Sequence, residues 1–473
     1  MKRAILFMVI ILPCLAYTQP LKKCATVITG TADYLREGDT VKLEIIKYGD
    51  FSAVKEFNET FTSIVKNSRC QFSISFCMPV YINLLFSQQD RKLNIYSYLI
   101  EPGSEISVHS LKADSFEFSG KDSRKFQIQY EKRKIWMAGS NRVKNRRPTN
   151  IIRAFATLDS FSFFELAYLK SKDKALGNTL YTILFFDVLG RSALKIDNLL
   201  PYKSPEIVEV WRNTLKEYKD PIWGKYNSND VNSSLLQYSY TYANALIARY
   251  RWDSCIIAQN PFDVIECYKY FAKALQGELR ERVITTLLYA NRSETAAVSY
   301  CLQSAFGFIS NKDFDSLLRT LKANLTMGSA AYQFKLQDTS GFFREYEEFK
   351  NKVILLDFWF TGCRACIEVH PKLDSIISMY KDDQIVLISV SIDKDRKKWI
   401  SSVDKEIYTS KHSINLFTNG AGDSHPIISH YLIGSYPKLI LIDKNGKLCD
   451  NPIDPRLDNG ANLVKLVDQT LKF

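Results

Sequence analysis

Histidine is scarce in this sequence, and its Cys-x-x-Cys motif, Cys363–Cys366, has no second copy. There are five histidines among the 473 residues. A structural zinc site needs four Cys or His ligands at characteristic spacings. His425 and His430 lie close together in sequence, but no further cysteine pair completes such a set. We therefore expect neither a metal site nor a cofactor.

Long apolar runs are absent after the first residues of the chain. A membrane-spanning helix needs about 20 mostly apolar residues, and no later stretch is both long and charge-free enough. The first residues differ, because Lys2 and Arg3 precede the apolar run Ala4–Leu12. Cys14-Leu15-Ala16 then fits the small-x-small rule for cleavage near Tyr17. We expect residues 1–16 to be a signal peptide.

A signal peptide predicts an exported protein, located in the periplasm or cell envelope of a bacterium. The alternative is a lipoprotein acylated at Cys14. Pro13, directly before this cysteine, makes a poor lipoprotein signal, so we rank that alternative second. Outside the cytoplasm disulfides persist, which changes how the remaining cysteines are interpreted.

Two cysteine pairs, Cys70 with Cys77 and Cys255 with Cys267, are close enough in sequence to form structural disulfides. Sequence alone does not fix their connectivity. The alternative is that each of these cysteines is a free thiol buried as a small apolar side chain, and we favour that interpretation.

The composition indicates packed domains with a basic surface. Apolar residues make up 46% of the chain and aromatics 13%, which argues against disorder. The net charge is +12, and part of the basic excess is clustered in Lys132–Arg147. No nucleic-acid-binding motif accompanies this cluster, so we interpret it as a solvated surface and expect no nucleic-acid partner.

Residues 24–120 have the pattern of a small antiparallel β-domain. β-branched and aromatic residues alternate or run together in short segments that turn residues separate. Strands are expected at Thr40–Tyr48, Cys70–Phe76, Val80–Phe86, Leu93–Ile100, Glu105–Ser110 and Phe116–Gly120. No catalytic constellation is present here, so the region is interpreted as a structural or docking domain.

Residues 121–325 switch to a helical period, which predicts an all-helical middle domain. Examples are Thr179–Leu194, Ser234–Tyr250, Asp263–Ala290 and Phe314–Leu325. The tyrosines between Tyr238 and Tyr250 recur at helical spacing and are interpreted as core residues. Residues 326–331, rich in small side chains, form a linker, and a third domain is expected at 332–473.

The stretch Val353–Pro371, VILLDFWFTGCRACIEVHP, predicts a buried strand, a turn and a helix that begins at Cys363. A helix N-terminus stabilises a thiolate, which is the nucleophilic form of cysteine. Cys366 lies on the same helical face and is placed to resolve a mixed disulfide. Asp357 puts a carboxylate into an apolar strand, which suggests a proton-transfer role.

This stretch resembles the thioredoxin superfamily. Asp357, Cys363, Cys366 and Pro371 are spaced as in thioredoxin. Ser435-Tyr436-Pro437 followed by KLILID looks like the cis-proline loop and its next strand. FKLQDTSG (334–341) and IVLISVSID (385–393) are similar to the extracytoplasmic TlpA/ResA-type branch, whose long members often carry an N-terminal β-domain. The resemblance implies an α/β thioredoxin fold for residues 332–473.

The motif departs from the family pattern at three places. Gly362 replaces the usual Trp before the first cysteine, and Arg364-Ala365 replaces a pair that often contains Pro. Val369 stands where many TlpA-like members have Glu, with Glu368 one place early. These changes leave the exchange chemistry in place and bear on the redox potential.

The resemblance implies an extracytoplasmic thiol–disulfide oxidoreductase that exchanges disulfides with protein clients, with client reduction as the favoured direction. Cys363 would attack, Cys366 would resolve and Asp357 would relay the proton of Cys366. Pro437, expected to be cis, and the Tyr436 backbone would bind the substrate strand. An unidentified membrane electron donor or acceptor would be the second partner.

Arg364 is the residue expected to tune the redox potential, because a cation beside Cys363 stabilises its thiolate. Two other classes stay open at this point. One is a binding or docking module with a redox-inert thioredoxin fold. The other is a thiol peroxidase, although a resolving cysteine three residues on is unusual for that class.

Overall fold

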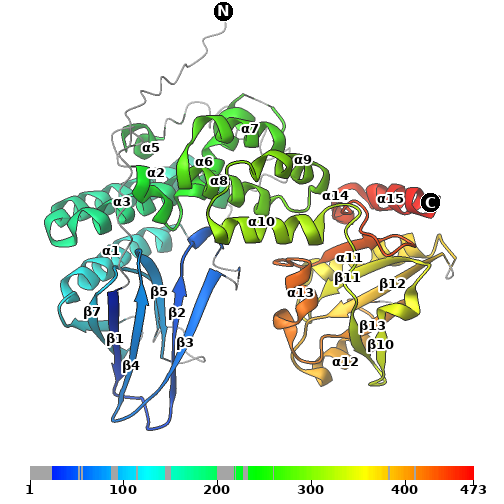
Figure 1. The fold of residues 1–473 in the computed structure, drawn as a ribbon, viewed down its shortest axis with the longest axis horizontal. Helices are drawn as coiled ribbons and strands as arrows, with labels where there is room; N and C mark the ends of the chain where they lie inside the picture. The colour runs from blue at the N-terminus through cyan, green and yellow to red at the C-terminus, as the bar shows by residue number, and fades with distance from the viewer. Residues whose placement is uncertain are drawn as a thin grey trace, which may run out of the picture. The chain divides into compact units, whose positions relative to one another are not determined.

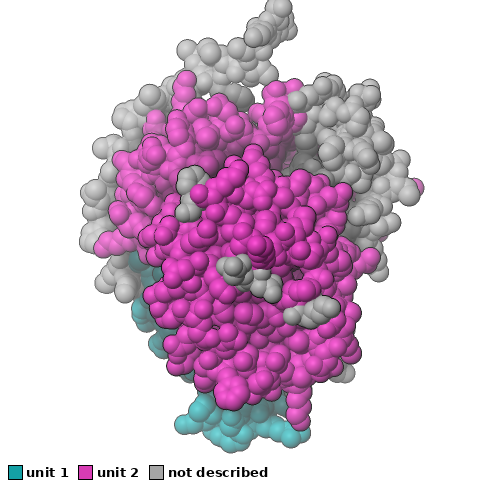
Figure 2. Space-filling model, turned by 90° about the vertical axis from the view of Figure 1, so that its right-hand side faces the viewer, with its two compact units in different colours: residues 1–48, 58–135, 168–184 teal, residues 49–57, 136–167, 185–473 magenta. Residues whose placement is uncertain are grey.

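The computed structural model describes residues 24–51, 54, 57–86, 94–112, 115–143, 151–199, 218, 220–226, 233–258, 260–381, 384–409 and 412–472. The expected signal peptide at residues 1–16 and the acylation alternative at Cys14 lie outside the described residues. The chain divides into two compact units (Figure 2). Unit 1 contains residues 1–48, 58–135 and 168–184, and unit 2 contains residues 49–57, 136–167 and 185–473.

Unit 1 is built on two four-stranded sheets (Figure 1). The first sheet has the order β4-β1-β7-β8, with β4 at Arg69–Phe76, β1 at Cys24–Ala32, β7 at Glu105–Lys112 and β8 at Ser115–Ser119. The second has the order β3-β2-β5-β6, with β3 at Asn58–Ile64, β2 at Thr40–Ile46, β5 at Val80–Leu85 and β6 at Ile95–Ile100. All neighbouring strands are antiparallel except the parallel pair β1 and β7.

One hydrophobic core joins the two sheets. Val41 and Leu43 of β2 and Ile74 of β4 are buried in it together with Val108 of β7. The alternating burial along β4 matches the period of two that identified this strand in the sequence. The predicted antiparallel β-region is therefore confirmed. It also contains two strands that were not predicted, β1 and β3, and the polar sequence of β3, NETFTSI, gave no apolar signal.

Helices follow the sandwich, as expected for the middle of the chain. The described helices up to residue 325 are α1 (Ser123–Arg142), α2 (Ile151–Ser171), α3 (Asp173–Leu199), α5 (Pro221–Tyr226), η4 (Ser233–Tyr238), α6 (Tyr242–Tyr250), η5 (Arg251–Ile257), α7 (Val264–Ala274), α8 (Gly277–Ala290), α9 (Thr295–Ala305) and α10 (Lys312–Leu325). None of the helices in the described ranges combines the length and the hydrophobicity that a membrane span needs.

Two helices predicted as continuous are broken in the structure. The first breaks near Ser239, because the Asp187 carboxylate accepts hydrogen bonds from the Ser239 hydroxyl (2.7 Å) and the Tyr240 N–H (2.6 Å). The second breaks between α7 and α8, where Gly277 adopts φ +60°. The Asp187 carboxylate and the left-handed conformation of Gly277 thus interrupt helices that the spacing of apolar residues had predicted to be continuous.

The C-terminal part of unit 2 contains a six-stranded sheet of order β10-β9-β13-β12-β11-β14 (Figure 1). Its strands are β9 (Lys335–Asp338), β10 (Phe343–Glu345), β11 (Val353–Trp359), β12 (Ile385–Ser391), β13 (Ser413–Phe417) and β14 (Lys438–Ile442). β11, β12 and β13 are parallel, whereas β14 runs antiparallel to β11. Parallel strands buried on both faces explain the near-continuous apolarity of β11 and β12.

Helices cover this sheet and complete the expected α/β fold. They are η6 (Tyr346–Phe349), α11 (Arg364–Ile377), α12 (Arg396–Asp404), η7 (Gly422–Ser424), α13 (Pro426–His430), α14 (Pro455–Asp458) and α15 (Ala461–Leu471). Val369 of α11 and Leu463 of α15 pack with Leu355 of β11 in one core. On the other face, the Phe358 ring meets Tyr431, directly after α13, at 6.2 Å.

Two details of this sheet differ from the sequence prediction. β13 was not anticipated, because its five residues follow a turn-rich stretch. The Asn445-Gly446 pair after β14 is a strong hairpin signal and predicts a second strand at Lys447–Cys449. The structure has only isolated bridges there, in which Leu448 pairs with Ile442 and Lys447 with Ala330. The second bridge brings the predicted linker (residues 326–331) against the hairpin.

Candidate functional site

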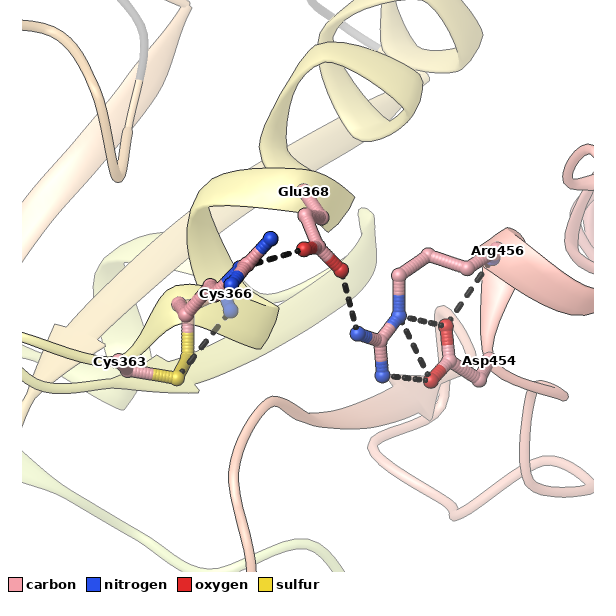
Figure 3. Close-up of polar contacts among 6 residues, drawn as sticks. Cys363, Cys366, Glu368, Asp454 and Arg456 are labelled. Carbon is pink, nitrogen blue, oxygen red and sulfur yellow. Dashed lines mark hydrogen bonds and ion pairs between the residues drawn. A yellow bond between two sulfur atoms is a disulfide. The ribbon is translucent and has the colours of Figure 1, made fainter. Parts of the chain in front are cut away.

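The two cysteines of the motif form a disulfide at the end of β11 and the start of α11 (Figure 3). Gly362, with φ +102°, makes the turn between the two elements. Cys363 is the N-cap of α11, and its sulfur accepts a hydrogen bond from the Cys366 N–H at 3.1 Å. The Cys363 sulfur therefore lies at the positive end of a helix, where a thiolate is stabilised.

An aromatic cluster buries this cysteine pair. Cys363 is only 5% exposed and Cys366 only 3%. Trp359, Trp399, Tyr408 and Phe417 are buried around them. These aromatic side chains come from four separate segments, so no local motif in the sequence indicates that the pair is buried.

Tyr408 fixes the turn that precedes Cys363. Its hydroxyl accepts a hydrogen bond from the Gly362 N–H at 2.8 Å. Its ring stacks on Trp359 with centroids 4.9 Å apart and planes 9° apart. Tyr408 thus holds this turn in place through its hydroxyl and its ring. It lies in a separate loop, and no sequence motif links that loop to the turn.

Asp393 holds the same turn from the end of β12. Its carboxylate accepts hydrogen bonds from the Thr361 N–H (3.1 Å and 3.2 Å) and from the Thr361 hydroxyl (2.7 Å). The Ser391 hydroxyl also donates to it, at 2.9 Å. Neither Asp393 nor Tyr408 was predicted from the sequence, although an acidic residue at the end of an apolar strand was a usable signal for Asp393.

Asp357 lies in the middle of β11, between Ser389 of β12 and Leu439 of β14 in the sheet register. It is 5% exposed, and burial raises the pKa of its carboxyl to about 7. Within the described chain its Oδ1 atom has no hydrogen-bond partner. An unpaired buried carboxyl that changes protonation near neutral pH suits proton transfer.

The predicted proline loop lies beside the cysteines. The peptide bond between Tyr436 and Pro437 is cis. Tyr436 packs against the cluster that contains Cys363, and its ring meets Phe360 edge-on at 5.6 Å. Burial raises the pKa of the Tyr436 hydroxyl to about 12. The structure thus brings this loop and the disulfide together.

Arg364 joins a chain of ion pairs on the surface, through Glu368 to Arg456 and Asp454 (Figure 3). Its side chain is 92% exposed, and its Nε lies 3.2 Å from Glu368. The other oxygen of Glu368 accepts from Arg456 Nη1 at 3.1 Å. Arg456 in turn pairs with Asp454 at 2.6 Å. Glu368, which departs from the family position, therefore links α11 to α14.

The other cysteines and histidines that the structure describes are not arranged in this way. The two structural disulfides considered from the sequence do not form, since Cys70, Cys77, Cys255 and Cys267 are free. The Cys70 sulfur instead bonds the Gly30 carbonyl oxygen at 3.4 Å inside the sandwich. His370 is half-buried, and burial lowers its pKa. Among the described residues, no group of three or more potential ligands is placed to bind a metal ion.

Comparison with known proteins places the similarity in this same region. Residues 351–448 match the thioredoxin-like family. The thiol-disulfide oxidoreductase ResA of Geobacillus kaustophilus is 25% identical over 160 residues, which cover 32% of this chain and 81% of that protein. The thioredoxin-like protein YneN of Bacillus subtilis is 25% identical over 123 residues, or 26% of this chain and 69% of that protein.

Similar solved structures come from Bacteroides. The thioredoxin domain of a thiol-disulfide oxidoreductase from Bacteroides vulgatus is 26% identical, covers 31% of this chain and 99% of its own, and has a TM-score of 0.27. A thiol:disulfide interchange protein from a Bacteroides species is 25% identical, with coverages of 32% and 93% and a TM-score of 0.27. The resemblance to TlpA/ResA-type oxidoreductases predicted from the sequence is confirmed, and it concerns about a third of the chain.

Proposed function

Because the C-terminal part of this chain is a thioredoxin-like domain, we propose that the protein is an extracytoplasmic thiol–disulfide oxidoreductase. It exchanges disulfides with protein clients through Cys363 and Cys366. One observation carries the proposal: a disulfide at the N-terminus of α11 shares a domain with a buried, unpaired carboxyl on β11, Asp357. This combination serves reversible thiol chemistry, whereas a purely structural disulfide needs no buried acid.

Client reduction begins with the Cys363 thiolate. It attacks one sulfur of a client disulfide, so that a Cys363–client bond forms and the second client sulfur leaves as a thiolate. Cys366 then attacks the Cys363 sulfur, the mixed disulfide breaks and the client leaves with both sulfurs reduced. Two electrons pass from the cysteine pair to the client, and Asp357 accepts the Cys366 thiol proton during this second attack.

The client segment lies along the Tyr436–Pro437 loop. An extended client strand pairs with the Tyr436 backbone, which brings the client disulfide to Cys363. Since the Tyr436 ring packs against the cysteine cluster, the client must displace it or slide past it. Tyr436 and Pro437 thus select the conformation of the client.

The direction of electron flow is the second part of the proposal. In a reductase, an electron donor in the membrane reduces Cys363–Cys366 again after each turnover. The apolar segment Ala4–Leu12 after Lys2 and Arg3 supports export, and the ResA relatives belong to the same kind of oxidoreductase. Arg364 sets the potential through its charge near Cys363, to the extent that Glu368 leaves that charge unpaired.

The reduction potential of the Cys363–Cys366 pair tests the proposal. The full chain is equilibrated with a dithiothreitol or glutathione series, and free thiols are counted by alkylation. A midpoint near that of thioredoxin, roughly −270 mV, supports a reductase, and a midpoint near roughly −120 mV reverses the direction. Cys366→Ser is the control that abolishes the couple. Absence of any titratable couple in the wild-type chain would leave only a docking module.

A turnover assay distinguishes a thiol–disulfide oxidoreductase from a thiol peroxidase. The reduced chain is mixed with either a protein disulfide or hydrogen peroxide, and loss of its thiols is followed over time. Faster consumption by the protein disulfide is expected, because Cys366 resolves a mixed disulfide within the same helix. Faster consumption by peroxide would assign the chain to the thiol peroxidases.

A further inference from the structure

A small cavity in unit 2 lies beside the loop that precedes Pro437. Its volume is about 130 Å³. Residues after α8, including Arg292 and Ser293, line one side, and Ser435, Lys438 and Asn451 line another. The cavity has room for about four waters at roughly 30 Å³ each. It is separate from the cysteine pair, which does not line it.

Several hydrogen-bond donors line this cavity. The ammonium of Lys438 donates to Asn451 Oδ1 at 3.3 Å and has two further N–H groups. The Arg292 guanidinium is held in place by bonds to the Leu432 carbonyl oxygen (2.9 Å) and the Tyr289 carbonyl oxygen (2.8 Å). Ser293 and Ser435 add two hydroxyl groups. A ligand with several acceptor oxygens satisfies such a set.

The two charged residues that line the cavity, Arg292 and Lys438, are both cations. Neither makes an ion pair within the part of the chain that the structure describes. The nearby Asp450 carboxylate is bound by the Thr295 hydroxyl and by the Asn451 N–H (3.0 Å) instead. Burial and the charge of Arg292 together lower the pKa of Lys438 to about 8. Two like charges in one cavity repel each other, and a bound anion removes this cost.

We propose that this cavity binds a small oxyanion, with Arg292 and Lys438 as its charged ligands and Ser293, Ser435 and Asn451 as neutral donors. The shared chemistry is a compact group with two or more anionic oxygens. Phosphate and sulfate supply it as free ions, and a small carboxylic acid supplies it as a carboxylate. A bound oxyanion would join the end of α8 to the segment before Pro437.

Calorimetric titration of the full-length oxidised chain tests the site. The probes are inorganic phosphate and succinate, each at constant ionic strength, with chloride as the background anion. We expect saturable one-to-one binding of at least one probe at pH 7. The probe that binds more tightly shows whether the site prefers a tetrahedral anion or a carboxylate.

Three variants identify the ligands. Lys438→Gln and Arg292→Gln are each expected to weaken binding by about tenfold or more, because each removes a charge-assisted donor. Asn451→Asp is nearly isosteric and places a carboxylate in the cavity, so binding should be abolished while the fold is retained. Lys447→Gln, an exposed lysine elsewhere in the same domain, is the matched control and should change nothing.

The pH dependence supplies an independent readout. Arg292 and Tyr431 are the other titratable residues that line the cavity with Lys438, and burial raises the pKa of the Tyr431 hydroxyl. With an anion whose own charge is constant above pH 7, such as sulfate or succinate, affinity should fall as pH rises through about 8, where Lys438 loses its proton. Binding should also take up protons near that pH. Absence of saturable binding by both probes, or binding that Asn451→Asp leaves intact, would overturn the proposal.

Discussion

Asp357 is a buried acid whose effect on stability depends on pH. Its pKa rises from about 3.8 to about 7 in the folded chain, so the folded state holds its proton longer than the unfolded state does. The unfolded chain binds fewer protons between these two values, and the free energy of unfolding therefore falls as pH rises from about 4 to about 7. The carboxyl that suits proton transfer is thus a source of instability at neutral pH.

Replacing Asp357 with Asn should stabilise the oxidised protein, because the amide cannot ionise. The gain in the free energy of unfolding should be near zero at pH 4 and reach a few kcal/mol at pH 8, with about 4 kcal/mol as the upper bound. Urea unfolding at both pH values measures it. Asp404→Asn, at an exposed carboxyl on α12, is the control. An equal gain at both pH values would contradict the assignment of a raised pKa.

Tyr408 is predicted to position the cysteine turn. Tyr408→Phe keeps the ring on Trp359 but leaves the Gly362 N–H without its acceptor. We expect a loss of about 1 kcal/mol in stability and a several-fold change in the rate of disulfide reduction by dithiothreitol.

Tyr380→Phe is the matched control, since its hydroxyl donates to Asp468 of α15 at 2.9 Å and its ring packs on a different core from the cluster that contains the cysteines. It should lower stability by a similar amount without changing that rate. If both variants leave the rate unchanged, Tyr408 has only a structural role.

Residues of the site were predictable to different degrees. Cys363, Cys366 and Asp357 lie within one short stretch, so their spacing alone identified them. Tyr408, Asp393 and Arg456 lie in three other segments, and only the fold brings them to α11. Residues that act through long-range contacts leave no local period or motif in the sequence.

At the scale of elements, the start of α11 is the feature that controls thiol reactivity. The helix N-terminus favours a thiolate at Cys363, and we propose that the charges of Arg364 and Glu368 modify this effect from the surface. Since exposed ion pairs contribute little to stability, Glu368 should matter more for the local field than for the fold.

Glu368→Gln should lower the pKa of the Cys363 thiol in the reduced protein, because it removes a negative charge and releases Arg364 and Arg456. The expected change is a few tenths of a pH unit at low salt, and it should shrink above about 0.5 M salt. The pH dependence of the alkylation rate measures it. Glu347→Gln, at another exposed acid, should have no effect. A rise in the thiol pKa would contradict this account.

Elements with a strong local period were predicted well, and those without one were missed. β4, β11 and β12 follow from alternating or continuous apolar residues. β3 and β13 have weak apolar patterns and form because neighbouring strands offer an edge to pair with. Pairing partners far away in sequence thus decide where short polar strands form.

At the scale of the whole molecule, the sequence predicted the order of a β-region, a helical region and a thioredoxin-like region. The comparisons cover the last of these, about a third of the chain. The domain boundaries at residues 120, 325 and 331 remain our proposal. Composition shifts locate such boundaries only coarsely, because helices α1, α2 and α3 each contribute residues to both compact units.

A fragment of residues 326–473 is predicted to fold alone and to retain disulfide exchange. Its sheet has helices α11 and α15 on one face and the segment at α13 on the other, all within the fragment. A cooperative thermal transition by circular dichroism and reduction of a protein disulfide test this. The fragment should lose oxyanion binding, since Arg292 is absent. An insoluble or non-cooperative fragment would show that the helical region is required.

The aromatic enclosure of Cys363 and Cys366 has a kinetic consequence. Small thiols and oxidants reach a buried sulfur slowly, whereas a client strand that moves Tyr436 opens a path to it. The reduced cysteine pair would then react little with small oxidants and would transfer its electrons only when a client binds. Movement of the Tyr436 ring would be the step that exposes the cysteine pair, so the protein would keep both thiols reduced until a client binds.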